Sequence, residues 1–116
     1  MKRLFIVCAL LSVFAIASAL SVFHKTFVET YKIKDDSTLG KAKCYICHTS
    51  SKGGKLNAYG NDIKAQMAKM HTKKVTADVL KSVENLDSDK DSVKNIDEIK
   101  KDALPGFKPG DEPHFE

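Results

Sequence analysis

Hydrophobic positions repeat with a helical period soon after an uninterrupted apolar start. Phe23, Phe27 and Tyr31 lie four residues apart. This spacing places their rings on one face of a helix and predicts that the face packs on a core. The polar residues 35–40 interrupt the pattern, and one or two helical turns are expected over residues 41–48.

Two further stretches repeat the same period. The first contains, at i, i+4 and i+7, the residues Ile63, Met67 and Met70. Another helix is expected to start from Thr72 or Thr76 as its N-cap and to end at Glu84. Its apolar side consists of Val75, Val79, Leu80 and Val83.

The remaining segments are expected to be loops, a short last helix and a tail. Gly53 and Gly54 predict a flexible loop over residues 49–55. An acidic loop from Asp87 to Glu98 precedes a short helix through about residue 102. The tail from residue 105 to 116 holds all three prolines and is expected to be extended. No segment shows the two-residue alternation of a strand, so the predicted class is all-α.

The N-terminus has the features of an export signal. Lys2 and Arg3 precede a run from Leu4 to Phe23 that carries no charge. The small residues over 17–19 predict cleavage before Leu20, which makes residues 1–19 a signal peptide. The alternative is an uncleaved membrane anchor, because about twenty apolar residues can span a bilayer. In both cases the rest of the chain is expected outside the cytoplasm, in the periplasm or secreted.

Charge and cysteine content narrow the function further. The net charge of +4 falls to +2 without Lys2 and Arg3, which is too weak and too mixed to indicate a nucleic-acid partner. Loss of the leader also removes Cys8 and leaves Cys44 and Cys47. A single small domain without tryptophan has a modest core, and such domains are often stabilised by a metal or a cofactor.

The two cysteines belong to the motif C-x-x-C-H, the attachment signature of c-type haem, formed by residues 44–48. Residues three apart share a helix face, so the thiols of Cys44 and Cys47 can reach both vinyl groups on one edge of a porphyrin. His48 then lies beneath the iron as its proximal ligand. No catalytic residue is assigned.

Other uses of a C-x-x-C pair are a redox dithiol, a disulfide or half of a zinc site. Zinc is disfavoured because the other histidines, at 24, 71 and 114, are scattered and no second cysteine pair exists. A thioredoxin-like motif requires a βαβ unit, and no strands are predicted.

The sixth iron ligand is less well defined by the sequence. Met70 is our predicted distal ligand, and Met67 and His71 are its rivals on the same predicted helix. A methionine opposite a histidine raises the reduction potential, a second histidine keeps it lower, and no ligand leaves an open site. The methionines also fit a purely structural role in the core. His24 is a more distant possibility, and His114 is expected to be exposed.

The acidic segment from Asp87 to Glu98 matches D-x-D-x-D-x-x-x-N-x-x-E, the spacing of oxygen ligands around Ca²⁺. The predicted calcium ligands are Asp87, Asp89, Asp91, Val93 through its carbonyl, Asn95 and Glu98. Ser92 occupies the sixth position, where glycine normally takes a positive φ, so a weak site is expected. The alternative is an acidic turn that caps the last helix with Asp97 and Glu98.

Two resemblances follow from these motifs. Residues 43–48 and 56–60, preceded by the aromatic stripe, are similar to small monohaem c-type cytochromes of environmental bacteria. Residues 87–98 resemble an EF-hand-like loop. The resemblance implies an all-α, cytochrome c-like domain over residues 20–104, wrapped around one covalent haem, with the calcium loop near its C-terminal end. It departs from the usual pattern in lacking a clear distal methionine on a late loop.

The expected function is an exported electron carrier, rather than an enzyme, that acts between redox partner proteins. Lysines at 41, 43, 52 and 55 are suited to steering an acidic redox partner. An open sixth site instead implies a haem peroxidase or a gas-binding protein. Without haem, the chain is a calcium-binding interaction module with a Cys44–Cys47 disulfide. The oligomeric state is not indicated by the sequence.

Overall fold

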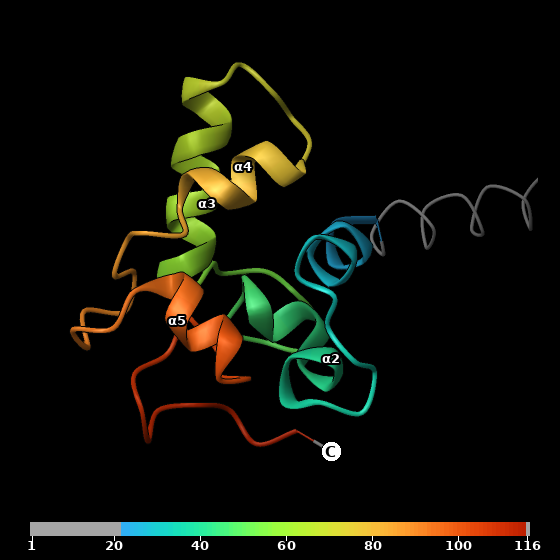
Figure 1. Ribbon diagram of the computed structural model, residues 1–116, viewed down its shortest axis with the longest axis vertical. Helices are drawn as coiled ribbons and strands as arrows, with labels where there is room; N and C mark the ends of the chain where they lie inside the picture. Colours follow the sequence, from blue (N-terminus) through green and yellow to red (C-terminus); the bar gives the residue numbers. More distant parts are fainter. Residues whose placement is uncertain (1–21, 116) are drawn as a thin grey trace, which may run out of the picture.

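The computed structural model describes residues 22–115 and contains short helices joined by loops (Figure 1). The predicted signal peptide and its cleavage site lie outside the described residues. Within them, no helix is both long and apolar enough to cross a membrane. The only strand-like pairing in residues 22–115 is one isolated antiparallel bridge between His48 and Leu56. The predicted all-α class is confirmed.

The helical order follows the predicted stripes. A helix over residues 22–31 comes first in the described part. The next elements are α2 (Thr38–Ala42), the 3-10 helix η1 (Lys43–Ile46), α3 (Ala58–Lys69), α4 (Ala77–Ser82) and α5 (Asn95–Lys100). Thr76 caps α4 by accepting a hydrogen bond from the Val79 N–H, as its sequence position predicted.

Several predicted boundaries were wrong. The polar segment over 35–40 is not only a break, because α2 begins inside it at Thr38 after the N-cap Ser37. α4 ends at Ser82 rather than at Glu84, and α5 ends at Lys100 rather than near residue 102. The differences concern the start of one short helix and the ends of two others, and helix ends vary by one or two residues more readily than helix centres.

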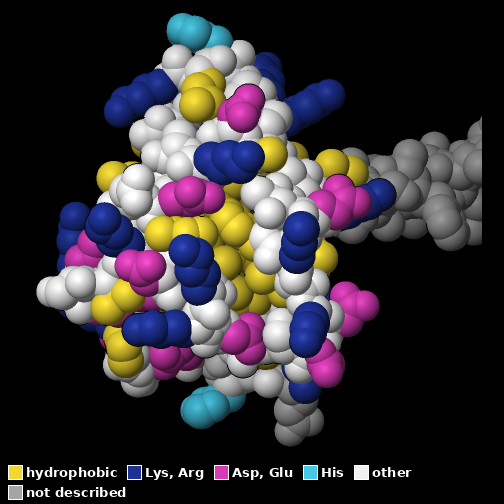
Figure 2. All heavy atoms as spheres, viewed as in Figure 1, with side chains coloured by type: hydrophobic (Ala, Val, Ile, Leu, Met, Phe, Trp, Pro, Cys, Tyr) yellow, Lys and Arg dark blue, Asp and Glu magenta, His cyan; other side chains and the backbone are white. Residues whose placement is uncertain are grey.

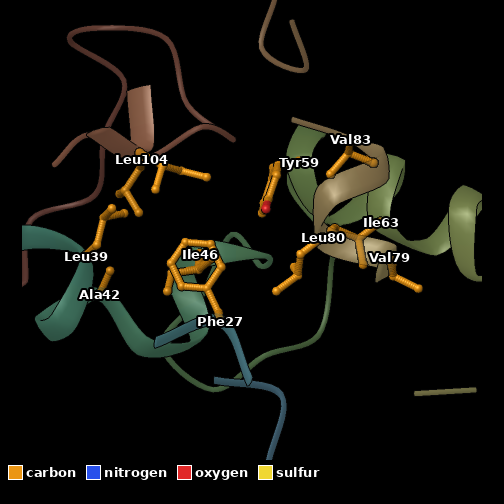
Figure 3. Close-up of a cluster of buried hydrophobic side chains, with 11 residues drawn as sticks. Phe27, Leu39, Ala42, Ile46, Tyr59, Ile63, Val79, Leu80, Val83 and Leu104 are labelled. Carbon is orange, nitrogen blue, oxygen red and sulfur yellow. The ribbon is translucent and has the colours of Figure 1, made fainter. Parts of the chain in front are cut away.

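One apolar cluster joins all these elements (Figure 3). Phe27 contributes the aromatic stripe of the first helix, and its ring lies 5.1 Å from Tyr31 and 6.4 Å from Tyr59 of α3. The buried members are Phe27, Leu39, Ala42, Ile46, Tyr59, Ile63, Val79, Leu80, Val83, Ile99 and Leu104. Since Ile46 lies between the two cysteines, the C-x-x-C-H turn is built on the core itself.

The tail packs on the same core instead of extending freely. Pro105 and Gly106 are buried, and Phe107 and Phe115 pack against the core cluster. The Phe115 ring stacks on Tyr45, with ring centroids 5.6 Å apart. The tail therefore covers one side of the C-x-x-C-H turn and belongs to the same folded body.

Candidate functional site

The C-x-x-C-H motif forms a single tight turn at the end of α2. Cys44 lies in η1, and the N–H groups of Cys47 and His48 both donate to the Cys44 carbonyl, at 3.3 and 2.8 Å. The Cys44 side chain is exposed and that of Cys47 is half-buried, and the thiols are not bonded to each other. The turn thus brings both sulfurs and the histidine to one short segment, as the motif predicted.

His48 has one ring nitrogen fixed and one available. Its Nδ1 lies 3.0 Å from the Gly54 carbonyl oxygen. A carbonyl only accepts, so Nδ1 donates in this contact, and in the neutral ring the lone pair is then on Nε2. Histidines that bind metals usually donate their other N–H to such an acceptor, which fixes both tautomer and ring orientation.

Residues 49–55, predicted to be a flexible loop, form a hairpin that places a carbonyl group against the His48 ring. The Thr49 N–H donates to the Lys55 carbonyl at 2.9 Å, and the Asn57 N–H donates to the Cys47 carbonyl at 2.8 Å. Gly54 has φ +80, which a glycine adopts without strain. The Gly53-Gly54 pair therefore does more than add flexibility, because it turns a carbonyl toward the imidazole.

The Asn57 side chain connects the C-x-x-C-H turn to α3 through hydrogen bonds. It is 4% exposed, and its Oδ1 caps α3 by accepting from the Gly60 N–H at 2.9 Å. Its Nδ2 donates to the carbonyls of Tyr45 and Ile46 at 2.9 and 3.1 Å, with His48 O at 3.4 Å. One amide thus joins the start of α3 to the C-x-x-C-H turn. Gly60 completes this contact, because a Cβ there would collide with the Cys47 carbonyl.

The environment of Cys47 opposes thiolate chemistry. Burial, together with the nearby Cys44, raises the pKa of the Cys47 thiol to about 12. Burial therefore disfavours the thiolate form of Cys47, which a redox-active C-x-x-C pair uses.

Apolar surface is open beside this turn. Figure 2 shows hydrophobic side chains gathered at the centre of one face, between α4, α5 and α2, with lysine and acidic side chains around them. Cys47 belongs to the half-buried apolar side chains that pack against the core. The Tyr59 hydroxyl is buried in this core and forms no hydrogen bond with any of residues 22–115. A separate cavity of about 910 Å³ is lined by α2 and the tail and contains neither cysteine nor His48.

The predicted distal ligands lie apart from the motif. Met70 is the C-cap residue of α3 and is 44% exposed. Ten residues separate it from Gly60, which corresponds to about 15 Å along a helix axis. His71 is exposed, while Met67 is half-buried against the core. His24, in contrast, has a buried Nε2 without a hydrogen-bond partner.

The acidic loop gathers its carboxylates as the calcium motif predicted. One oxygen each from Asp87, Asp89 and Asp91 lies within 4.8 Å of the others. Oxygen ligands that surround a Ca²⁺ ion at about 2.4 Å also lie no more than about 4.8 Å apart. The loop is wrapped inward, because the Ser92 N–H donates to Asp87 Oδ2 at 2.9 Å and the Val93 N–H donates to Asp91 Oδ1 at 2.9 Å.

Two buried oxygens of this loop have no donor. They are Oδ2 of Asp89 and Oε2 of Glu98, on side chains that are 6% and 5% exposed. Burial, and then the neighbouring Asp91 and Asp89, raises the pKa of Glu98 to about 9. Among residues 22–115, no lysine or arginine forms an ion pair with these carboxylates. The cluster is therefore a set of oxygen ligands without a compensating positive charge.

Asn95, one of the predicted calcium ligands, forms hydrogen bonds within the protein. It is fully buried, and its Nδ2 donates to the Val83 carbonyl at 2.9 Å and to Ser88 Oγ at 2.8 Å. Its Oδ1 accepts from the Ser88 N–H at 3.2 Å. The amide thus closes the base of the loop. Ser92 has φ 74, so the sixth position does adopt the positive φ expected there.

Several residues that build these sites were not found from the sequence. Asn57 was considered only within residues 56–60, although an asparagine just before an amphipathic stretch is a possible N-cap signal. Asp102 accepts from the Thr38 and Leu39 N–H groups at 2.7 and 2.9 Å and so caps α2. Ser88 donates to Asp62 Oδ2 at 2.6 Å and ties the acidic loop to α3. No local pattern reveals the last two contacts, which join distant segments.

Comparison with protein-family models, with curated proteins and with solved structures finds no match to this chain. The function is therefore argued from the two sites themselves.

Proposed function

We propose that the protein is an exported monohaem c-type cytochrome that carries electrons between redox partners. The observation that carries this proposal is the state of His48. Its Nδ1 is bound to the Gly54 carbonyl, so Nε2 is free to bind iron within the turn that presents Cys44 and Cys47. Metal-binding histidines usually donate their other ring N–H to such an acceptor, so this contact supports the assignment of His48 as an iron ligand.

The surrounding residues suit a haem in two ways. Cys44 and Cys47 would hold it through thioethers, and their sulfurs are free. The apolar surface between α2, α4 and α5 would cover its faces (Figure 2). When bound, haem supplies a one-electron couple, and the chain contributes attachment, orientation and exclusion of water.

Partner choice would depend on the lysines around the turn. Lys41, Lys43, Lys52 and Lys55 are all exposed. A group of positive charges beside the site of electron exchange favours an acidic partner and raises its association rate at low ionic strength. We therefore propose an acidic redox protein as the partner.

The test is haem attachment in a host that matures c-type cytochromes. The pyridine haemochrome spectrum of the denatured protein should show an α-band shifted as for two saturated vinyl groups. The haem should also stay with the protein through acid–acetone extraction. Cys47→Ala should lose one thioether and shift the band, while Cys8→Ser, in the predicted leader, should leave the spectrum unchanged. A haem-free protein with a Cys44–Cys47 disulfide would refute the proposal.

The second proposed activity is calcium binding by residues 87–98. It is supported by the two buried oxygens without donors, which a cation would satisfy together with the clustered aspartates. Asp87, Asp89, Asp91 and Glu98 would provide carboxylate oxygens and Val93 its carbonyl. Asn95 would support the loop from beneath instead of binding the ion.

Thermal unfolding with and without calcium tests this activity. After EDTA treatment, added CaCl₂ should raise the stability by about 2.7 kcal/mol when calcium is 100 times its Kd. Asp89→Asn should remove most of this shift, and Asp111→Asn, at an exposed position of the tail, should retain it. An equal response of both variants would contradict a site in this loop.

A further inference from the structure

We propose that the far end of α3 docks the protein on an anionic lipid surface. This end, called the basic tip below, carries one exposed methionine among positively charged side chains. Its members are Lys64, Lys69, Met70, His71, Lys73 and Lys74. Binding at the tip requires neither haem nor calcium, so the inference goes beyond the two activities proposed above.

The net positive charge of the chain is concentrated at this tip. No acidic residue lies between Asp62 and Asp78, whereas the same stretch contains four lysines. The whole chain has 19 Lys and Arg against 15 Asp and Glu, so outside this stretch 15 basic residues balance 15 acidic ones. A local excess of charge on an otherwise balanced chain favours binding to a surface of opposite sign.

The tip lysines are not neutralised within the protein. In the described part of the chain, the one ion pair joins Lys25 to Glu29. The α3 dipole accounts for Lys69, in the last helical turn, because cations are stabilised at helix C-termini. It does not account for Lys73 and Lys74, which lie beyond the helix. Their charges are therefore available to a partner.

The tip is an ordered turn at the end of α3, at the top of Figure 1. The Thr72 N–H donates to the Met67 carbonyl at 3.0 Å. The His71 N–H donates to the Ala68 carbonyl at 3.3 Å, and His71 has φ 52. This is the left-handed turn that commonly ends helices. The Lys74 N–H then donates to Thr72 Oγ1 at 3.2 Å, so hydrogen bonds hold the backbone that presents the lysines.

Met70 favours lipid over an acidic protein as the occupant. It is 44% exposed at the C-cap of α3, directly between Lys69 and His71. At an anionic bilayer, headgroup phosphates attract the ammonium groups while the acyl boundary takes up the apolar side chain. Figure 2 shows lysine side chains on both sides of this narrow end. A stable protein interface normally buries about 800 Å² per partner, which suits a broader face.

Docking at the tip would leave the C-x-x-C-H turn accessible. The α3 helix has 12 residues, which correspond to about 18 Å along its axis. Its N-cap, Asn57, bonds to the turn, and the tip lies at its other end. A lipid surface and a redox partner can therefore approach opposite ends of α3.

Vesicle binding of the exported chain, without residues 1–19, tests the proposal. The haem-loaded protein is mixed with vesicles of phosphatidylcholine alone or together with phosphatidylglycerol, and the bound fraction is measured by sedimentation. The wild type should bind only the vesicles that contain phosphatidylglycerol. It should be released at about 1 M NaCl, where the screening length falls to about 3 Å.

Two lysine variants with equal net charge separate the tip from the overall charge. The tip variant combines Lys69→Gln, Lys73→Gln and Lys74→Gln. The control variant changes exposed lysines elsewhere and combines Lys100→Gln, Lys101→Gln and Lys108→Gln. The tip variant should bind about 100-fold more weakly, because each lysine near an anionic surface contributes about fivefold. The control should bind like the wild type, and Met70→Ala should bind about fivefold more weakly.

Several outcomes would overturn the proposal. They are a wild type that does not bind anionic vesicles, equal binding to neutral and anionic vesicles, and equal weakening in the tip and control variants. Poly-L-glutamate represents an acidic protein in the same assay. If the tip binds this polymer but not the vesicles, it is a protein-docking surface instead.

Haemochrome analysis of the same samples reports the proposed function separately. A haem-free chain that still binds anionic vesicles through its tip would refute the cytochrome and retain this inference. A haem-loaded chain that binds no vesicles would do the reverse.

Discussion

The C-x-x-C-H turn and the acidic loop are built alike but differ in what they need in order to be complete. Each is organised by one buried asparagine: Asn57 bonds three carbonyls behind the turn, and Asn95 closes the base of the loop. In the turn, the candidate ligand groups do not repel one another. In the loop, the ligand groups are negative charges packed within 4.8 Å.

The two sites therefore differ in whether they keep their conformation without a bound ligand or ion. Backbone hydrogen bonds, together with that of the His48 ring, satisfy the turn without any ligand. The loop leaves two carboxylate oxygens buried without donors, so its carboxylates destabilise the chain until a cation is present. We therefore expect the turn to be preformed and the loop to depend on its ion.

The largest effect is expected from removal of the Asn57 amide. Asn57→Ala leaves the carbonyls of Tyr45 and Ile46 and the Gly60 N–H without a partner. Unpaired buried polar groups cost about 1–3 kcal/mol each, and we expect a loss of about 3 kcal/mol in urea unfolding. Asn61→Ala, at an exposed position of α3, is the control and should change little.

Parallel alanine substitutions of Asn57 and Asn95 should differ in how their stability depends on calcium. The loss in Asn57→Ala should be the same with and without calcium. Asn95→Ala should also lose the calcium-dependent part of the stability, because the loop loses its base. If both variants respond equally to calcium, the two sites are not independent in the way we describe.

A medium effect is expected at Asp102, which connects the end of α5 with the start of α2. Partial burial alone would raise its pKa, but the N–H groups of Leu39 and Thr38 lower the pKa below its usual value. The capping contribution is therefore complete above an unfolded pKa of about 3.9 and is lost as the pH falls through the lower folded value.

Asp102→Asn should lower the free energy of unfolding by about 1 kcal/mol at neutral pH. It should also reduce the loss of stability at acid pH (the acid limb), measured as urea midpoints between pH 6 and pH 2.5. Asparagine tolerates the positive φ at this position, so the backbone is retained. Asp111→Asn should keep the wild-type acid limb. An unchanged limb in Asp102→Asn would show that another carboxylate governs it.

The smallest expected effect is a gain in stability when Ser92 is replaced by glycine. A non-glycine residue at φ 74 is strained by about 1–2 kcal/mol, and glycine removes this strain at an entropic cost of about 0.5–1 kcal/mol. Ser92→Gly should therefore stabilise the protein by about 0.5 kcal/mol and tighten calcium binding in isothermal titration. Ser92→Ala keeps the strain and should show no gain, so equal behaviour of the two variants would argue against strain at this residue.

Periodic patterns and short motifs predicted the parts of this molecule that depend on local sequence. The aromatic stripe at Phe27 and the Thr76 cap were predicted because their signals lie within one or two helical turns. The beginning of α2 was missed although its N-cap, Ser37, is local, and the second group that bonds its first N–H groups, Asp102, comes from a distant part of the chain. The role of Asn57 was missed because an amide can bind an ion, a backbone or both, and only the fold decides.

The contact between Asp102 and Thr38 has a consequence for the order of events during synthesis. It joins residues 64 positions apart, so the N-terminal turn of α2 lacks this cap until the C-terminal end of the chain has been made. Long-range contacts of this kind form late because closing a long loop costs entropy. The nascent segment that carries the two cysteines is therefore expected to stay open, with its thiols accessible to modification, until the last helix arrives and closes it.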